Sequence, residues 1–164
     1  SARGAEGTAA SGLCVTVSDA PTSSTNCTYT WGYWKNHEED WPALPGGVLM
    51  LGSVAYTQAE LLDIFDEPVA GNGLISLAHQ LIAAKLNILA GADPSAASAA
   101  ITGADALIGS LVVPPIGSGY LAPSSTSGFT QTLDDYNNGL IGPGHCATVP
   151  VDPATWGKIK GLYR

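Results

Sequence analysis

The sequence predicts a mainly α-helical domain, a compact bundle of about four helices around a central apolar helix at residues 74–90, with β-like extensions at both ends. The stretch from Gly73 to Gly91 is long, nearly all apolar and bounded by a glycine at each end. At 100° per residue its polar side chains fall on one narrow stripe, so neighbouring helices must cover the rest of its circumference. That stripe consists of Ser76, Gln80, Ala83 and Asn87. Helix-start signals on both sides of the stretch supply those neighbours.

Two of the neighbouring helices are predicted from their caps. Thr57 and Glu60 form a capping box, in which each side chain bonds the other residue's backbone N–H, and the helix that follows must end before Pro68. Asp93 and Pro94 supply an N-cap and a first-turn proline for the helix after the central one. The apolar positions of that helix keep a helical rhythm: Ala97, Ile101, Ala104, Ile108 and Leu111.

The last helix is predicted to be capped by Ser125 or Thr126 and to end at Gly139. Its apolar face carries Phe129, Leu133 and Tyr136. The polar residues near its end do not have the spacing of a calcium-binding EF-hand loop, so we interpret them as ordinary helix-end polarity. They are Asp134, Asp135, Asn137 and Asn138.

Composition divides the chain into three segments. Residues 1–26 are mainly Gly, Ala, Ser and Thr with one β-like run, Leu13 to Val17, and such an arm cannot bury a core of its own. Residues 27–146 form the predicted helical domain. Residues 147–164 are punctuated by prolines and then extended. Two extended ends on a compact domain suit the linking of subunits, although the arm could also lie on its own domain or pair with the tail.

The charge content excludes some classes of function. The net charge is −8 and no basic residue lies between Lys85 and Lys158, so a nucleic-acid partner is not expected. No apolar run is long enough to span a membrane. Only 12% of the residues are charged, about half the roughly 25% of typical domains. A neutral surface suits a subunit covered by its neighbours, and it suits equally a secreted monomer with a Ser/Thr/Ala-rich surface.

Three cysteines are too few for a disulfide scaffold, but two of them border the helical domain. If Cys27 and Cys146 pair, they close a loop of roughly 120 residues, worth about 4–5 kcal/mol in the chain-entropy model. An oxidising, extracellular setting would follow. Cys14 would then be free or bonded to a neighbouring molecule; alternatively, it is itself the partner of Cys27.

Aromatic residues concentrate in a short segment that contains Trp31, Tyr33, Trp34 and Trp41. These rings either close one end of the bundle, the reading we favour because aromatics bury so much area, or form a platform on which a sugar ring stacks. The adjacent run from His37 to Asp40 offers metal-capable groups, but contiguous ligands rarely converge on one ion. We therefore expect a solvated acidic turn, and neither a metal site nor a cofactor.

Four motifs carry a resemblance to a known domain. They are TWGYWKNHxxxWP at 30–42, GNGLISLAHQLIAAKLN at 71–87, DALI at 105–108 and TLDDYNNGxIGPGHC at 132–146. Together they resemble an uncharacterised domain that recurs in secreted and cell-surface proteins of bacteria. The ending TWGKIKGLYR is similar to short tails of various secreted bacterial proteins. The resemblance implies an extracellular location and brings with it no established activity.

Lys85 is the one charged residue of the central helix, and it falls opposite the polar stripe. A lysine in that position either extends its ammonium group to solvent or pairs with a carboxylate such as Glu60 or Asp134. A third alternative is a covalent isopeptide bond to an Asn or Asp side chain, as in some surface fibres.

The leading functional hypothesis is a structural subunit of an extracellular filament or cell-surface layer. Each subunit would donate strand-like terminal segments to other copies of itself, with Cys14 as a covalent lock. The alternative is a secreted module that binds surface glycans through the aromatic cluster. No catalytic constellation is recognisable, so an enzyme is not expected. The predicted assembly residues are Leu13, Cys14, Val15, Val17, Trp156, Ile159, Leu162 and Tyr163.

Overall fold

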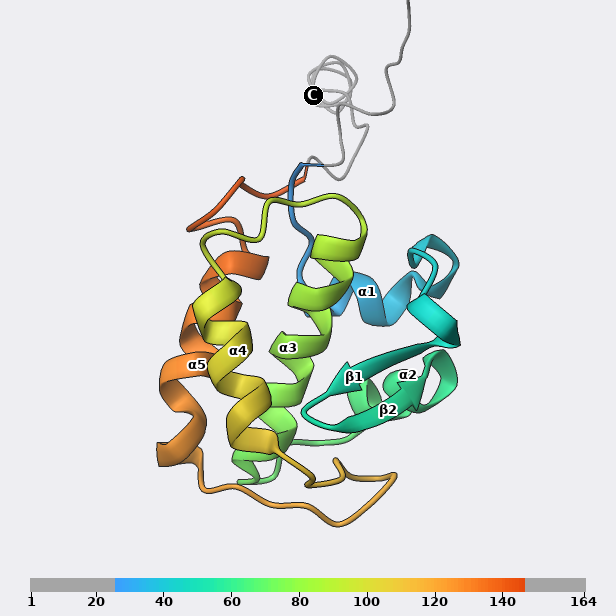
Figure 1. Ribbon diagram of the computed structural model, residues 1–164, viewed down its shortest axis with the longest axis vertical. Helices are drawn as coiled ribbons and strands as arrows, with labels where there is room; N and C mark the ends of the chain where they lie inside the picture. Colours follow the sequence, from blue (N-terminus) through green and yellow to red (C-terminus); the bar gives the residue numbers. More distant parts are fainter. Residues whose placement is uncertain (1–25, 147–164) are drawn as a thin grey trace, which may run out of the picture. The chain divides into compact units, whose positions relative to one another are not determined.

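The helix α3, Gly73–Leu89, is the centre of the structure (Figure 1). The computed structural model describes residues 26–146. All but four residues of α3 are buried, because it contacts four other helices and a strand. In Figure 1, α4 and α5 lie on one side of α3, while α1, α2 and a β-hairpin lie on the other. The mainly α-helical class and the central apolar helix are therefore confirmed.

Four helices and one hairpin surround α3. The helices are α1 (Trp31–Asn36), α2 (Gln58–Asp66), α4 (Ser98–Ile108) and α5 (Pro123–Asn137). The hairpin consists of β1 (Val48–Leu51) and β2 (Val54–Thr57), and two 3-10 turns, η2 (Glu38–Asp40) and η3 (Pro45–Gly47), precede it. These elements lie in one unit that spans residues 26–145. The predicted assembly residues in the arm and the tail lie outside the described residues.

The hairpin and α1 are absent from the sequence prediction. β1 and β2 pair antiparallel through a two-residue turn, with Leu49 opposite Tyr56 and Leu51 opposite Val54. Gly52 takes the left-handed backbone conformation that opens this turn, with φ at 65°. A side chain there would also collide with the end of α4, since its Cβ would lie 2.3 Å from the carbonyl oxygen of Gly109. The hairpin is thus fixed by close backbone contact with α4.

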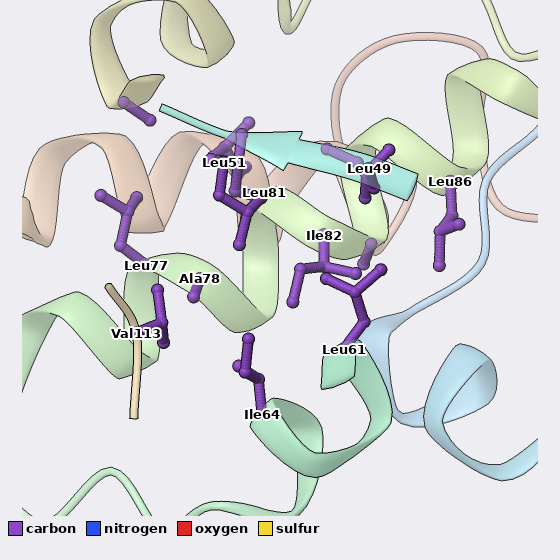
Figure 2. Close-up of a cluster of buried hydrophobic side chains, with 14 of the residues drawn as sticks. Leu49, Leu51, Leu61, Ile64, Leu77, Ala78, Leu81, Ile82, Leu86 and Val113 are labelled. Carbon is purple, nitrogen blue, oxygen red and sulfur yellow. The ribbon is translucent and has the colours of Figure 1, made fainter. Parts of the chain in front are cut away.

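The core lies where the hairpin, α2 and α3 meet. Figure 2 shows Leu49 and Leu51 of β1 beside Leu81, Ile82 and Leu86 of α3, with Leu61 and Ile64 approaching from α2. Each of these side chains is at least nine-tenths buried. Burying a side chain of this size contributes roughly 1.5–3 kcal/mol. The hairpin is therefore an integral part of the domain and holds one face of α3.

Most helix ends agree with the predictions from the sequence. The capping box is present, with Thr57 N donating to Glu60 Oε1 at 2.9 Å and Glu60 N to Thr57 Oγ1 at 3.3 Å. α2 ends at Asp66, before Pro68. Gly91 and Gly139 follow the ends of α3 and α5 with φ at 117° and 79°.

Two helix starts were predicted wrongly. α4 begins at Ser98 rather than after Asp93, because a separate turn intervenes in which Ala97 N and Ser98 N both bond to Pro94 O, at 2.9 and 2.8 Å. α5 begins at Pro123, where the proline is preset for the first turn. Thr126 is consequently buried inside the helix, and its hydroxyl bonds to the carbonyl of Pro123 at 3.2 Å.

Candidate functional site

The predicted aromatic cluster packs α1 against α2 and α3. Trp34 is only 1% exposed, and its Nε1 donates to Asn87 of α3 at 3.1 Å. Trp31 stacks on His79 with ring centroids 4.5 Å apart. Trp41 packs edge-on against Phe65 and donates from Nε1 to the carbonyl of Trp34 at 2.8 Å. These rings thus fill the space between three helices, the arrangement expected of rings that close one end of the bundle.

Tyr33, the fourth predicted ring, belongs to a separate stack. Its ring lies parallel to those of Tyr29 and His37, at centroid distances of 3.9 and 4.1 Å. The plane of Tyr33 is turned 83° from that of Trp34. Its hydroxyl donates to Asp40 at 2.5 Å. Burial, and to a smaller extent this hydrogen bond, raises the pKa of Tyr33 well above its ordinary value. The four predicted rings therefore do not form one flat platform.

A buried polar network joins α1, α3 and α5. Asn87 acts like a peptide group, since its Oδ1 accepts from Tyr29 N at 2.8 Å and its Nδ2 donates to Tyr29 O at 2.9 Å. The same Nδ2 donates to Asn137 of α5 at 3.0 Å. Asn137 Nδ2 in turn donates to Gln80 O at 3.0 Å and to Gln80 Oε1 at 2.9 Å. We refer to Trp34, Gln80, Asn87 and Asn137 as the polar network.

The sequence suggested that Asn137 is ordinary helix-end polarity, and this interpretation is wrong. It is fully buried, whereas its neighbour Asn138 is exposed. The signal was present in the sequence, because Asn137 follows Leu133 by four residues and so lies on the apolar face of α5. The polar stripe of α3 faces it and supplies its partners.

His79 is buried in the aromatic cluster, where its Nε2 lies 2.7 Å from the carbonyl oxygen of Ile64. Burial is the main cause that lowers the pKa of His79 below its ordinary value of 6.5. Within residues 26–146, no three His, Cys, Asp or Glu side chains gather in a group that could hold a metal ion. His79 therefore serves in packing and as an internal hydrogen-bond donor.

We expect the protein to lose stability in mild acid through His79. Because its pKa is lower in the folded state than in the unfolded one, this contribution is complete above about pH 6.5 and is lost as the pH falls from there through the folded pKa. Urea unfolding at about pH 7.5 and about pH 5.5, for the unchanged protein and for His79→Gln, isolates the effect. An identical pH dependence in the two proteins would contradict this role for His79.

Both cysteines of the described region, Cys27 and Cys146, are disulfide-bonded. The residues beside them, Thr28 and His145, form a parallel β-bridge, and Thr28 N donates to Gly144 O at 2.8 Å. Thr28 is fully buried, and its hydroxyl donates to the carbonyl of Tyr136 at 2.9 Å. The two ends of the helical domain are thus held together. Cys14 lies outside the described residues.

Lys85 pairs with Asp105 of α4, not with Glu60 or Asp134. Its Nζ lies 2.8 Å from Asp105 Oδ2 and donates to the carbonyl oxygen of Met50 in β1 at 2.6 Å. Asp105 Oδ1 also accepts from Gly52 N in the hairpin turn at 2.9 Å. This ion pair therefore connects α3, α4 and the hairpin. Asp105 was missed as the partner because it lies on a different helix from Lys85, and which side chains of two helices meet depends on how the helices pack.

An open apolar groove of about 390 Å³ lies directly beside this ion pair. Its floor and walls come from β1, from the C-terminal half of α3 and from α4. Two of its apolar side chains are substantially exposed, Met50 at 42% and Leu89 at 37%. The apolar residues that line it, apart from Pro45, are Val48, Leu49, Met50, Ile88, Leu89 and Ile101. The groove is thus a surface where apolar side chains from another segment could be buried.

The free edge of β1 borders this groove. Leu51 and Val54 flank the two-residue turn and form a hydrogen-bonded pair, and such pairs alternate along the hairpin. The backbone N–H and C=O groups of Leu49 and Leu51 therefore point toward β2, and those of Val48 and Met50 point away. Met50 O accepts from Lys85, and Val48 N donates to Pro45 O. Within residues 26–146, no hydrogen bond reaches Val48 O or Met50 N on this edge. We refer to the groove and this edge together as the β1 groove.

No protein-family model, no curated protein and no solved structure matches the chain. Within the described part of the chain, none of the helices is long and apolar enough to cross a membrane.

Proposed function

We propose that the protein is a structural, non-enzymatic subunit of an extracellular filament or cell-surface assembly, in which a strand-like terminal segment of one copy binds to the next copy. The observation that carries this proposal is the β1 groove. It combines exposed apolar side chains with a strand edge on which Val48 O and Met50 N have no hydrogen bond within residues 26–146, the two features by which a sheet accepts an added strand. An open edge of this kind invites association unless something covers it.

The composition supports the same proposal. With only 12% charged residues, much of the surface is neutral, as suits a subunit that its neighbours cover. The two disulfide-bonded cysteines lie at the bases of both terminal segments, and disulfides persist in oxidising, extracellular surroundings. A domain closed at the base of its terminal segments keeps its own fold while those segments bind elsewhere.

We expect the full-length protein to form oligomers or filaments and a variant of its arm to remain monomeric. The variant replaces Leu13, Val15 and Val17 by serine, which removes the apolar face of the arm and preserves the length of the chain. Sedimentation velocity and negative-stain electron microscopy measure the outcome. A matched variant with serine at Trp156, Ile159 and Leu162 tests the tail in the same way.

Two results would contradict the proposal. If the unchanged protein is a monomer at all concentrations tested, the structural role fails, and binding of glycans by the aromatic cluster becomes the hypothesis to test. If neither serine variant changes the assemblies, the terminal segments are not the means of association.

A further inference from the structure

We infer that the β1 groove accepts residues Leu13 to Val17 of a neighbouring copy as a third strand, with Val15 opposite Leu49. This inference rests on the proposed function for its choice of a neighbouring copy over the chain's own arm. It adds the identity of the donated segment and its register, which follow from the hydrogen-bonding groups left on β1.

The free edge of β1 offers one acceptor and one donor, Val48 O and Met50 N, on either side of Leu49. Two such groups can bond to a single added residue in a parallel pairing, or to the two residues that flank it in an antiparallel pairing. In both cases one residue of the added strand lies opposite Leu49, and its side chain points to the same face of the sheet as Leu49. The two groups therefore centre the added strand on Leu49, whichever direction the strand runs.

The register with Val15 opposite Leu49 centres the apolar side chains of the arm on the groove. With Val15 opposite Leu49, the period of two puts Leu13, Val15 and Val17 on the groove face. Cys14 and Thr16 then lie on the opposite face, which they share with Val48 and Met50. A shift of one residue would put Cys14 and Thr16 into the groove and leave the three larger side chains in water.

The chemistry of the two surfaces agrees with this pairing. The arm carries no charged residue between Glu6 and Asp19. The groove has one charged residue in its lining, Lys85, and that ammonium group is already paired with Asp105. An uncharged apolar strand can thus enter without leaving an unpaired charge buried. The tail is a poorer fit, because Lys158 and Lys160 alternate with its apolar residues.

The length of the arm limits how far its strand-like segment can lie from its own domain. Eight residues separate Val17 from Asn26, the first described residue, and an extended chain covers at most roughly 3.3 Å per residue. The nine steps from Val17 to Asn26 can therefore span up to about 30 Å.

Disulfide trapping tests both the site and the register. The acceptor is the full chain with Cys14→Ser and Met50→Cys, so that its own arm has no thiol and any link must form between copies. One donor is the unchanged chain, and the other carries Cys14→Ser and Thr16→Cys. An antiparallel strand brings Cys14 opposite residue 50, and a parallel strand brings residue 16 there. We expect a covalent dimer with one donor and not the other, identified by mass spectrometry.

A matched acceptor places the new thiol on a different exposed residue. Tyr120 is 57% exposed and lies outside the groove lining, so Cys14→Ser with Tyr120→Cys should give at least about tenfold less dimer than Met50→Cys with the same donor. Equal trapping at both positions would mean nonspecific oxidation and would overturn the assignment of the groove.

A second pair of variants tests the groove without new thiols. Leu89→Glu puts a carboxylate into the groove lining and should weaken association about 10-fold to 100-fold, whereas Leu140→Glu, at a residue 73% exposed and outside the lining, should leave it unchanged. Normal unfolding curves for both variants would show that the fold is intact.

The outcomes separate this inference from the proposed function. If the unchanged protein assembles but Met50→Cys traps neither donor, the assembly stands and the acceptor lies elsewhere. A chain that carries Met50→Cys and keeps Cys14 should link between copies; a purely internal link would show that the arm covers its own groove and would overturn donation to a neighbour. If the unchanged protein fails to assemble, both the proposed function and the inference about the β1 groove are contradicted.

Discussion

Replacement of Asn137 by alanine should destabilise the protein by about 3–5 kcal/mol, because it leaves several buried groups without partners. One N–H of Asn87 Nδ2 loses its acceptor while the other keeps Tyr29 O, and Gln80 loses the donor to both its carbonyl oxygen and its Oε1. Each buried group left unpaired costs about 1–3 kcal/mol. The free energy of unfolding from urea titrations measures the effect.

Asn138→Ala is the matched control for this prediction. Asn138 is the next residue in the chain and the same residue type, but it is exposed, and within residues 26–146 its side chain bonds only to Asp134. Its replacement should change the free energy of unfolding by no more than about 0.5 kcal/mol. Similar losses for the two alanine variants would show that the polar network does not hold α5 to α3.

The second large effect is expected when Cys27 and Cys146 are both replaced by alanine. A disulfide between them closes a loop of roughly 120 residues, and the loss of that constraint on the unfolded chain costs about 4–5 kcal/mol in the chain-entropy model. The polar network remains in the double variant, so we expect a folded protein with a lower unfolding midpoint.

The single variant Cys14→Ser is the control for the disulfide, because it should leave the stability of an isolated chain unchanged. Peptide mapping of the unreduced protein should recover a fragment that joins the regions around Cys27 and Cys146. A fragment that joins Cys14 to Cys27, or a loss of stability in Cys14→Ser, would contradict the pairing.

The elements with strong local signals were predictable from the sequence. The central helix was found because its apolar run is long and ends at Gly91, and α2 because Thr57 and Glu60 form a capping box. These signals depend only on residues close together in the chain. Helix starts with competing signals were placed less well, as the turn between Asp93 and Ser98 shows.

The hairpin was missed because its strands are short and owe their stability to distant residues. β1 reads as a brief apolar run, which periodicity alone cannot assign to a strand or a helix. Two hydrogen bonds hold the hairpin in place: Lys85 Nζ donates to Met50 O, and Gly52 N donates to Asp105 Oδ1. Each bond joins residues more than 30 positions apart in the sequence. The β1 groove depends on three separate elements, so no single stretch of sequence could reveal it.

The polar network also depends on contacts between distant elements, and its residues belong to the motifs that carry the resemblance to a known domain. Trp34 comes from the first motif, Gln80 and Asn87 from the second, and Asn137 from the last. The residue types were visible in the sequence, but their partners were not, since a hydrogen bond between helices depends on how the helices pack. Three of the four motifs thus meet in one buried network.

The most direct test of strand donation is a cryo-electron microscopy map of the assembled, unchanged protein at a resolution that shows side chains. We expect a third strand beside β1, with three apolar side chains in the groove and continuous density that leads to the domain of a different copy. Assemblies in which the β1 groove is open, or is filled by the arm of the same copy, would contradict donation between subunits.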